Sequence, residues 1–230
     1  MYARILEENK RKRQVKEMDM IDRIEQAGIV PVVVIENAQD AVPTAKALLA
    51  GGITFMEITF RTECAIDAIR NVARSVPEMV VGAGTIWNQK QAEQAVDAGA
   101  SFIVSPGLDE ETVIWCQEKN IPVIPGCVTP TEIIRAMHLG LSVVKFFPAN
   151  IYGGIKAIRA LGGVFRNISF LPTGGVDAEN MIEYVQEKSV LAIGGSWVCP
   201  AKDITGHQFE KITSVSRDAV EKIHANKAAQ

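Results

Sequence analysis

From residue 29 onward, short runs rich in Val and Ile alternate with longer amphipathic stretches. The short runs have the length and composition of buried strands, and several of the stretches between them end on Gly or Asn, as helices do. Strands that alternate with helices pair in parallel, through right-handed crossovers. The alternation therefore predicts an α/β fold around a parallel sheet. The eight predicted strands cover residues 29–35, 53–60, 79–84, 102–105, 122–125, 142–146, 168–172 and 190–194.

The number of these units narrows the architecture further. A chain of 230 residues has the length of a barrel in which eight strands are each followed by a helix. We predict a (β/α)8 TIM barrel that forms a single catalytic domain over residues 29–230, and a doubly wound open sheet is the alternative fold. Residues 1–28 are rich in charge, and we predict that they add an N-terminal helix with a solvated face.

Composition narrows the class of partner. The formal net charge is -3, and the chain has no basic footprint of the kind that binds a phosphate backbone. Small molecules are therefore the expected ligands, and nucleic acid is not. The first twenty residues carry charge where a signal peptide needs an apolar core, and no later run reaches the length of a membrane span. We predict a cytoplasmic protein without membrane contact.

The cysteines and histidines form no metal-binding pattern. No CxxC pair occurs, and the histidines do not have the spacing of metal ligands. We therefore expect no metal site, and we interpret the cysteines as free buried thiols in a reducing compartment. The residues concerned are Cys64, Cys116, Cys127, Cys199, His138, His207 and His224.

The second predicted strand carries charge on one of its faces. Side chains alternate between the two faces of a strand, so Glu57 and Arg61 share one face with Phe55 and Thr59. The opposite face is wholly apolar, which is typical of a barrel strand that packs under helices. We therefore expect Glu57 and Arg61 to point into the lumen, near its carboxyl-terminal mouth. The residues on the apolar face are Met56, Ile58 and Phe60.

Lys145 lies within the apolar run "LSVVKFFPAN" at residues 141–150, where a positive charge is costly to bury. A lysine at a strand end commonly extends its ammonium to water, and the run by itself favours that reading. If Val144 and Phe146 face the helices, however, Lys145 faces the lumen, on the same side as Glu57.

A Lys, a Glu and an Arg at one barrel mouth suggest a particular chemistry. An uncharged lysine amine can attack a carbonyl and form a Schiff base, which withdraws electrons from the neighbouring carbon–carbon bond. A carboxylate nearby can move protons, and an arginine can bind the carboxylate of a 2-keto acid. A structural salt bridge between Lys145 and Glu57 explains the same residues equally well.

Paired glycines end the last two predicted strands. Gly174 and Gly175 follow the seventh strand, and Gly195 lies at the end of the eighth; the hydroxyls of Thr173 and Ser196 flank them. Barrels commonly bind phosphate at these two positions, through exposed backbone N–H groups. The run "VGAGT" at 81–85 lacks the spacing of a dinucleotide motif, so no nucleotide cofactor is indicated.

Seven motifs together resemble the 2-keto-3-deoxy-6-phosphogluconate (KDPG) aldolases, some of which also act as 4-hydroxy-2-oxoglutarate (KHG) aldolases. The resemblance extends over about residues 29–200 and implies a homotrimeric (β/α)8 barrel. It also implies a class I aldolase that forms a Schiff base on a lysine and needs no cofactor. The motifs, in chain order, are "EITFRT", "GAGT", "FIVSPGLD", "IPGCVTPTEI", "VKFFPA", "PTGGV" and "IGGSW".

The resemblance assigns a role to each matching position. It implies that Lys145 is the Schiff-base lysine, that Glu57 is the general acid and base, and that Arg61 and Thr85 bind the pyruvyl carboxylate. The phosphate contacts that it implies are Thr173, Gly174, Gly175, Gly195 and Ser196, and the further pocket residues are Pro106 and Phe147.

The predicted reaction is the cleavage of KDPG to pyruvate and glyceraldehyde 3-phosphate, with KHG as a possible second substrate. The alternatives are an epimerase or isomerase acting on a sugar phosphate, and an aldolase for the galactonate epimer of KDPG. Two positions depart from the family pattern and lie where the aldehyde half would bind: Val34, where some relatives carry Arg, and Asn150, where many carry Glu.

Overall fold

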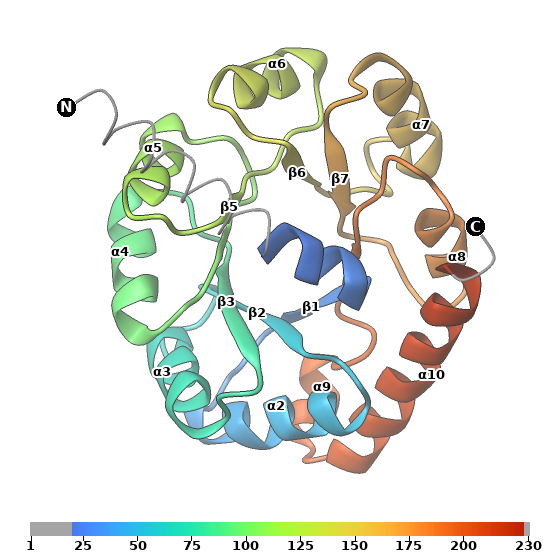
Figure 1. The fold of residues 1–230 in the computed structure, drawn as a ribbon. Helices are drawn as coiled ribbons and strands as arrows, with labels where there is room; N and C mark the ends of the chain where they lie inside the picture. Colours follow the sequence, from blue (N-terminus) through green and yellow to red (C-terminus); the bar gives the residue numbers. More distant parts are fainter. Residues whose placement is uncertain (1–19, 228–230) are drawn as a thin grey trace.

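Eight parallel strands form a closed barrel in the order of the sequence, and helices surround it (Figure 1). The computed structural model describes residues 20–227. Six strands pair in the order β5-β4-β3-β2-β1-β8, and β6 pairs with β7. Bridges between Gly126 and Lys145 and between Thr173 and Gly194 join these two sets. The strands are β1 (Ile29–Val33), β2 (Phe55–Thr59), β3 (Val80–Gly84), β4 (Ile103–Val104), β5 (Val123–Ile124), β6 (Val143–Phe146), β7 (Ser169–Pro172) and β8 (Ile193–Gly195).

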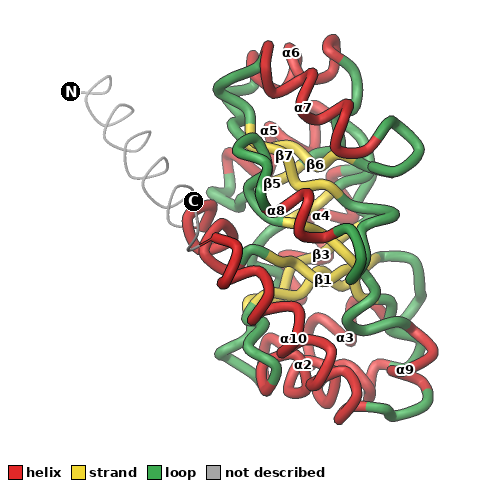
Figure 2. The backbone as a smooth tube through the Cα atoms, turned by 90° about the vertical axis from the view of Figure 1, so that its right-hand side faces the viewer, coloured by secondary structure: helices red, strands yellow, loops and turns green. Residues whose placement is uncertain are grey.

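The helices lie outside the strands, as the side view of Figure 2 shows. Several begin with a side chain that accepts a hydrogen bond from the first turn; Thr129 and Glu132 form a complete capping box at the start of α6. The prediction of a (β/α)8 barrel is confirmed, and the open sheet is wrong. The helices are η1 (Ala38–Asp40), α2 (Ala41–Ala50), α3 (Ala65–Ser75), α4 (Gln89–Ala98), α5 (Glu110–Glu118), α6 (Pro130–His138), α7 (Gly154–Val164), α8 (Met181–Val185), α9 (Ala201–Thr205) and α10 (Phe209–Lys227).

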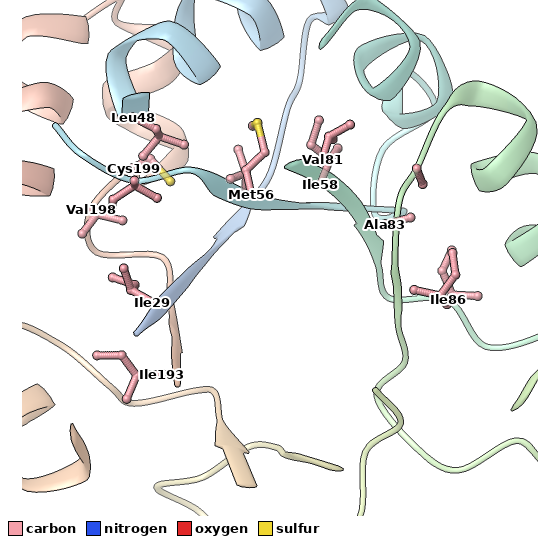
Figure 3. Close-up of a cluster of buried hydrophobic side chains, with 14 of the residues drawn as sticks. Ile29, Leu48, Met56, Ile58, Val81, Ala83, Ile86, Ile193, Val198 and Cys199 are labelled. Atoms are coloured by element: carbon pink, nitrogen blue, oxygen red, sulfur yellow. The ribbon is translucent and has the colours of Figure 1, made fainter. Parts of the chain in front are cut away.

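The strand period divides the buried side chains into two cores. Met56, Ile58 and Val81 point from β2 and β3 toward the helices, where they join the larger core (Figure 3). Phe55 lies on the other face of β2 and belongs to a smaller cluster inside the barrel. The predicted orientation of the second strand is therefore confirmed, because both clusters follow the alternation. The inner cluster also contains Val30, Val80, Phe102, Val104, Ile124, Val143 and Leu171.

A helical segment at residues 20–27 covers one end of the barrel; it is the blue helix within the ring of Figure 1. Its Ile24 is fully buried in the inner cluster, and Met20, Ile21 and Ala27 pack beside it. The outer side of this helical segment is solvated, and its inner face closes the lumen, which the sequence did not indicate. Residues 1–19, which the prediction of an N-terminal helix also covered, lie outside the described residues.

The described part of the chain also bears on the expected partners. None of the helices within residues 20–227 has the length and hydropathy that a membrane span requires. Over the same residues, no group of three or more His, Cys, Asp or Glu side chains is arranged to hold a metal ion. The four cysteines are free thiols, three of them buried and Cys64 half-buried.

Candidate active site

Lys145 and Glu57 meet inside the barrel, although 88 positions separate them in the sequence. Lys145 Nζ lies 3.1 Å from Glu57 Oε1 and 3.5 Å from Oε2. Both side chains are buried, with 4% of Lys145 and 1% of Glu57 exposed. An ammonium that reached water would be far more exposed, so Lys145 points into the lumen as strand alternation predicts.

The local sequence of β6 fixes this orientation. Val144 and Phe146 lie in the outer core against the helices, while Val143 lies in the inner cluster. Lys145 therefore extends inward, on the same face of β6 as Val143 and two residues after it. Its ammonium also lies 5.4 Å from the centre of the Phe147 ring, within the range of a cation–π contact. The amine is thus surrounded by the apolar inner cluster and the Phe147 ring, and its charged contact is with Glu57.

Arg61 and Thr85 form a second contact close to this pair. The Arg61 Nε–H donates to Thr85 Oγ1 at 3.2 Å, which links the ends of β2 and β3. Thr85 adopts a φ of 59°, a conformation that is uncommon outside glycine and turns the chain at the end of the strand. Arg61 is exposed at the mouth, so its guanidinium is free to bind a carboxylate there.

A pocket of about 290 Å³ opens at this end of the barrel. Phe147 connects this pocket to the buried pair, because its ring contacts the Lys145 ammonium. Arg61, which contacts Thr85, also lines the pocket. Gly174, Gly175 and Gly195, at the ends of β7 and β8, also line it. The lining residues are Val32, Val34, Arg61, Phe147, Thr173, Gly174, Gly175, Val176, Gly195, Ser196, Pro200 and Ala201.

The glycines form a loop against which a phosphate could lie. Gly174 and Gly175 have φ values of 89° and 76°, which side chains rarely adopt. A Cβ atom at Gly175 would also lie 2.4 Å from the Asn150 side chain. Within residues 20–227, the N–H groups of Gly175 and Ser196 donate no hydrogen bond. Two free amides beside an open pocket are suited to bind an anion.

Four of the predicted site residues are not part of the pocket lining. Lys145 and Glu57 lie deeper in the lumen, and Thr85 lies behind Arg61. Pro106 follows β4, and its carbonyl oxygen would lie 2.2 Å from a Cβ at Gly126. The structure therefore brings the phosphate candidates and Arg61 into one pocket, while Thr85 contacts Arg61 from outside the lining.

The structure adds pocket residues that the sequence reasoning missed. Val32 lies on the inward face of β1, two residues before Val34, and strand alternation could have identified it. Pro200 and Ala201 lie at the start of α9, beyond the last predicted motif. No sequence signal marks them, because their position depends on how the chain turns after β8.

Cys127 lies beside the lysine strand, since its backbone N–H donates to the Lys145 carbonyl at 2.9 Å. Burial raises the pKa of Cys127 to about 12, and the carboxylate of Glu132 adds to the rise. The thiol is therefore protonated at neutral pH and a poor nucleophile. The amine of Lys145 is therefore a stronger candidate than this thiol for the nucleophile at this end of the barrel.

Comparison with known proteins identifies the family. The sequence model described as "Aldolase: KDPG and KHG aldolase" matches residues 20–215. The chain belongs to this family. The KHG/KDPG aldolase of Escherichia coli K12 is 48% identical over 193 residues, which cover 84% of this chain and 91% of that protein. The family membership predicted from the seven motifs is confirmed.

Solved structures of aldolases have the same fold. The KDPG aldolase of Legionella pneumophila, captured with pyruvate as a covalent carbinolamine intermediate, aligns with a TM-score of 0.82 and 39% identity, covering 84% of this chain and 95% of that one. The aldolase of Zymomonas mobilis ZM4 with 3-phosphoglycerate aligns with a TM-score of 0.80 and 40% identity, covering 86% and 94%.

Proposed function

We propose that this protein is a class I aldolase that cleaves KDPG to pyruvate and glyceraldehyde 3-phosphate through a Schiff base on Lys145. The observation that carries the proposal is the buried contact of 3.1 Å between Lys145 Nζ and Glu57 Oε1 beside an open pocket. It joins a nucleophile to a proton acceptor in a space that excludes bulk water.

The first half of the reaction forms the imine. The Lys145 ammonium gives a proton to the Glu57 carboxylate, and the neutral amine that results attacks C2 of the keto acid. A second proton moves from this nitrogen to the C2 oxygen, which produces a carbinolamine. Glu57 returns a proton to the carbinolamine hydroxyl, which leaves as water. The resulting iminium carbon is bonded to C3, and the iminium withdraws electrons from the C3–C4 bond.

The second half breaks the carbon–carbon bond. Glu57, again a carboxylate, takes the proton from the C4 hydroxyl, directly or through a water molecule. The electrons of the C3–C4 bond move into the enamine, and glyceraldehyde 3-phosphate leaves. Protonation of the enamine at C3 and hydrolysis of the imine then release pyruvate and regenerate the amine.

The remaining site residues hold the two ends of the substrate. Arg61 and Thr85 bind the pyruvyl carboxylate, and their contact of 3.2 Å orients both groups toward one ligand. The loop of Thr173, Gly174 and Gly175, with Gly195 and Ser196, binds the phosphate. The relative from Zymomonas mobilis, solved with 3-phosphoglycerate, supports a phosphorylated three-carbon aldehyde. The name of the Escherichia coli relative supports KHG as a second substrate.

The proposal extends to cofactors, assembly and location. Each step above uses only protein side chains, so the enzyme works without a metal or cofactor. We propose a homotrimer in the cytoplasm. The side chains of Ile114, Ile134 and Met137 support an interface between subunits, since they expose 38–45% of their area on α5 and α6. These two helices are linked by an ion pair between Arg135 and Glu110.

Reduction with borohydride in the presence of pyruvate tests the proposal. We expect a single stable adduct, located on the peptide that contains Lys145 by mass spectrometry. Lys145→Ala should give no adduct, whereas Lys156→Ala, a control on exposed helix α7, should give the wild-type amount. An epimerase or isomerase forms no imine, so an absent adduct, or one on another lysine, would refute the class I mechanism.

A further inference from the structure

Gly84, at the end of β3, lies directly against the carboxylate of Glu57. A Cβ atom at position 84 would lie 1.9 Å from Glu57 Oε1 and 2.5 Å from both Cδ and Cγ. Real Cβ contacts essentially never fall below 3.0 Å. The volume that an alanine side chain would need is therefore already occupied by the carboxylate of Glu57.

Space, and not backbone conformation, explains the glycine at this position. Gly84 has no positive φ, unlike Gly174 and Gly175 in the phosphate loop, so its backbone is open to any residue. Its carbonyl accepts a hydrogen bond of 2.8 Å from the Phe60 N–H, which continues the β2–β3 pairing. The backbone at this strand end would thus accept alanine, whereas the neighbouring Glu57 side chain would not.

The oxygen that fills this space is the one that contacts the lysine. Glu57 Oε1 accepts from Lys145 Nζ at 3.1 Å. In the β2–β3 register Glu57 is paired with Gly82, and Gly84 is paired with Thr59. The Glu57 side chain therefore leans along its strand, over Gly84 and toward the mouth of the barrel. A side chain at position 84 would force Oε1 away from this position.

The surroundings limit any other adjustment. Glu57 is buried, and the volume beside Gly82, two residues earlier on β3, is filled by the Phe102 ring, which a Cβ there would meet at 2.3 Å. The carboxylate cannot move down the lumen because Phe102 occupies it. The strand itself is held by pairing to both β2 and β4.

We propose that Gly84 is a positioning residue that sets the distance between the Glu57 carboxylate and the Lys145 amine during proton transfer. The proposal rests on the function proposed above. Gly84 makes no contact with substrate in this role; it acts by leaving room for Glu57. A misplacement of about 1 Å in a catalytic group can lower a rate by about 100-fold.

The substitution Gly84→Ala tests the proposal. We expect kcat for KDPG cleavage to fall by about 100-fold while KM changes by less than about threefold, because Arg61 and the phosphate loop still bind substrate. Gly82→Ala is the matched control on the same face of the same strand. It displaces the Phe102 ring and not Glu57, so it should lower the thermal midpoint while kcat falls much less than in Gly84→Ala. A Gly84→Ala enzyme with kcat within about threefold of wild type would overturn the proposal.

A shorter carboxylate provides the second readout. Glu57→Asp withdraws the carboxylate from position 84, so it should lower kcat strongly in the wild-type background and much less in the Gly84→Ala background. Equal losses in both backgrounds would mean that the two positions act independently, which overturns the proposal. If Gly84→Ala does not fold, recovery of folding in the double variant supports the clash with Glu57, and failure of the double variant refutes it.

The borohydride experiment separates the two proposals. If wild-type protein forms no adduct on Lys145 with pyruvate, the proposed function fails. If wild type forms the adduct and cleaves KDPG, but Gly84→Ala does so at the wild-type rate, only the role of Gly84 fails.

Discussion

At the scale of single residues, the buried pair of Lys145 and Glu57 requires an explanation. Removing two charges from water costs several kcal/mol per ion, and an apolar pair of similar size is often as stable. Lys145 and Glu57 have almost no exposed area, so the pair is weak support for a purely stabilising role. The proposed aldolase mechanism would account for the cost, because both groups exchange protons in it.

Glu57→Gln should separate catalysis from binding. The amide keeps the shape of the side chain but cannot accept a proton, so we expect kcat to fall by about 10²–10⁴-fold. Pyruvate should still protect the protein against thermal unfolding, because Arg61 and Thr85 are unchanged. Pyruvate release measured with a coupled reductase checks the rate. A kcat within about threefold of wild type would remove Glu57 from the proton-transfer role.

At the scale of elements, the helical segment at residues 20–27 has a defined structural task. The inner cluster would be open at one end of the barrel without Ile24, which contacts no solvent. The segment is also tied to α10, since Lys227 Nζ donates to the Glu25 carbonyl. Helix α10 therefore holds the segment at residues 20–27 against the barrel.

Ile24→Ala should lower the free energy of unfolding by about 2–5 kcal/mol, because it leaves a cavity below the lumen. Ile24→Val should cost about 0.5–1.5 kcal/mol. Gln26→Ala, on the exposed side of the same segment, should change stability by less than about 0.5 kcal/mol. Guanidinium unfolding curves of the three variants check this order. Equal stability of the Ile24→Ala and Gln26→Ala proteins would contradict a plugging role.

At the scale of the whole molecule, buried thiols on three separate parts of the barrel make stability depend on pH. Burial raises the pKa of Cys116, Cys127 and Cys199 to about 12, from an ordinary value of 9.0. A raised pKa means that folding favours the protonated thiol. The stabilisation is fully present below pH 9.0 and is lost as the pH rises from there toward 12.

We therefore expect the free energy of unfolding to fall as the pH rises from 9 toward 12, because each of the three thiols ionises more readily in the unfolded chain than in the folded one. A variant with alanine at all three positions should be less stable at pH 8 but should show a shallower decline. Lysine and tyrosine titration is common to both proteins, so the difference in slope reports the cysteines. Identical slopes would show that the thiols ionise equally in the folded and unfolded chains.

Much of the fold could be predicted from the sequence. The eight strands occur where the Val/Ile runs lie, because side-chain alternation and β-branched composition are local properties. The strand ends are less regular: the predicted strand at 102–105 shortens to Ile103–Val104, and that at 190–194 shifts to Ile193–Gly195. Pairing with neighbouring strands determines those ends, and pairing partners are distant in the sequence.

For the candidate site, the inward direction of Lys145, Glu57 and Arg61 follows from strand parity, and the family from the order of the motifs. The contact between Lys145 and Glu57, the pocket wall formed by Pro200 and Ala201, and the space that Gly84 leaves depend on the closure of the barrel. Closure brings β2, β3 and β6 around one lumen. The sequence by itself determined which side chains face inward, since that is set by the pleat of each strand; only the tertiary structure decided which of them touch, because the distances between strands depend on the packing of the whole barrel.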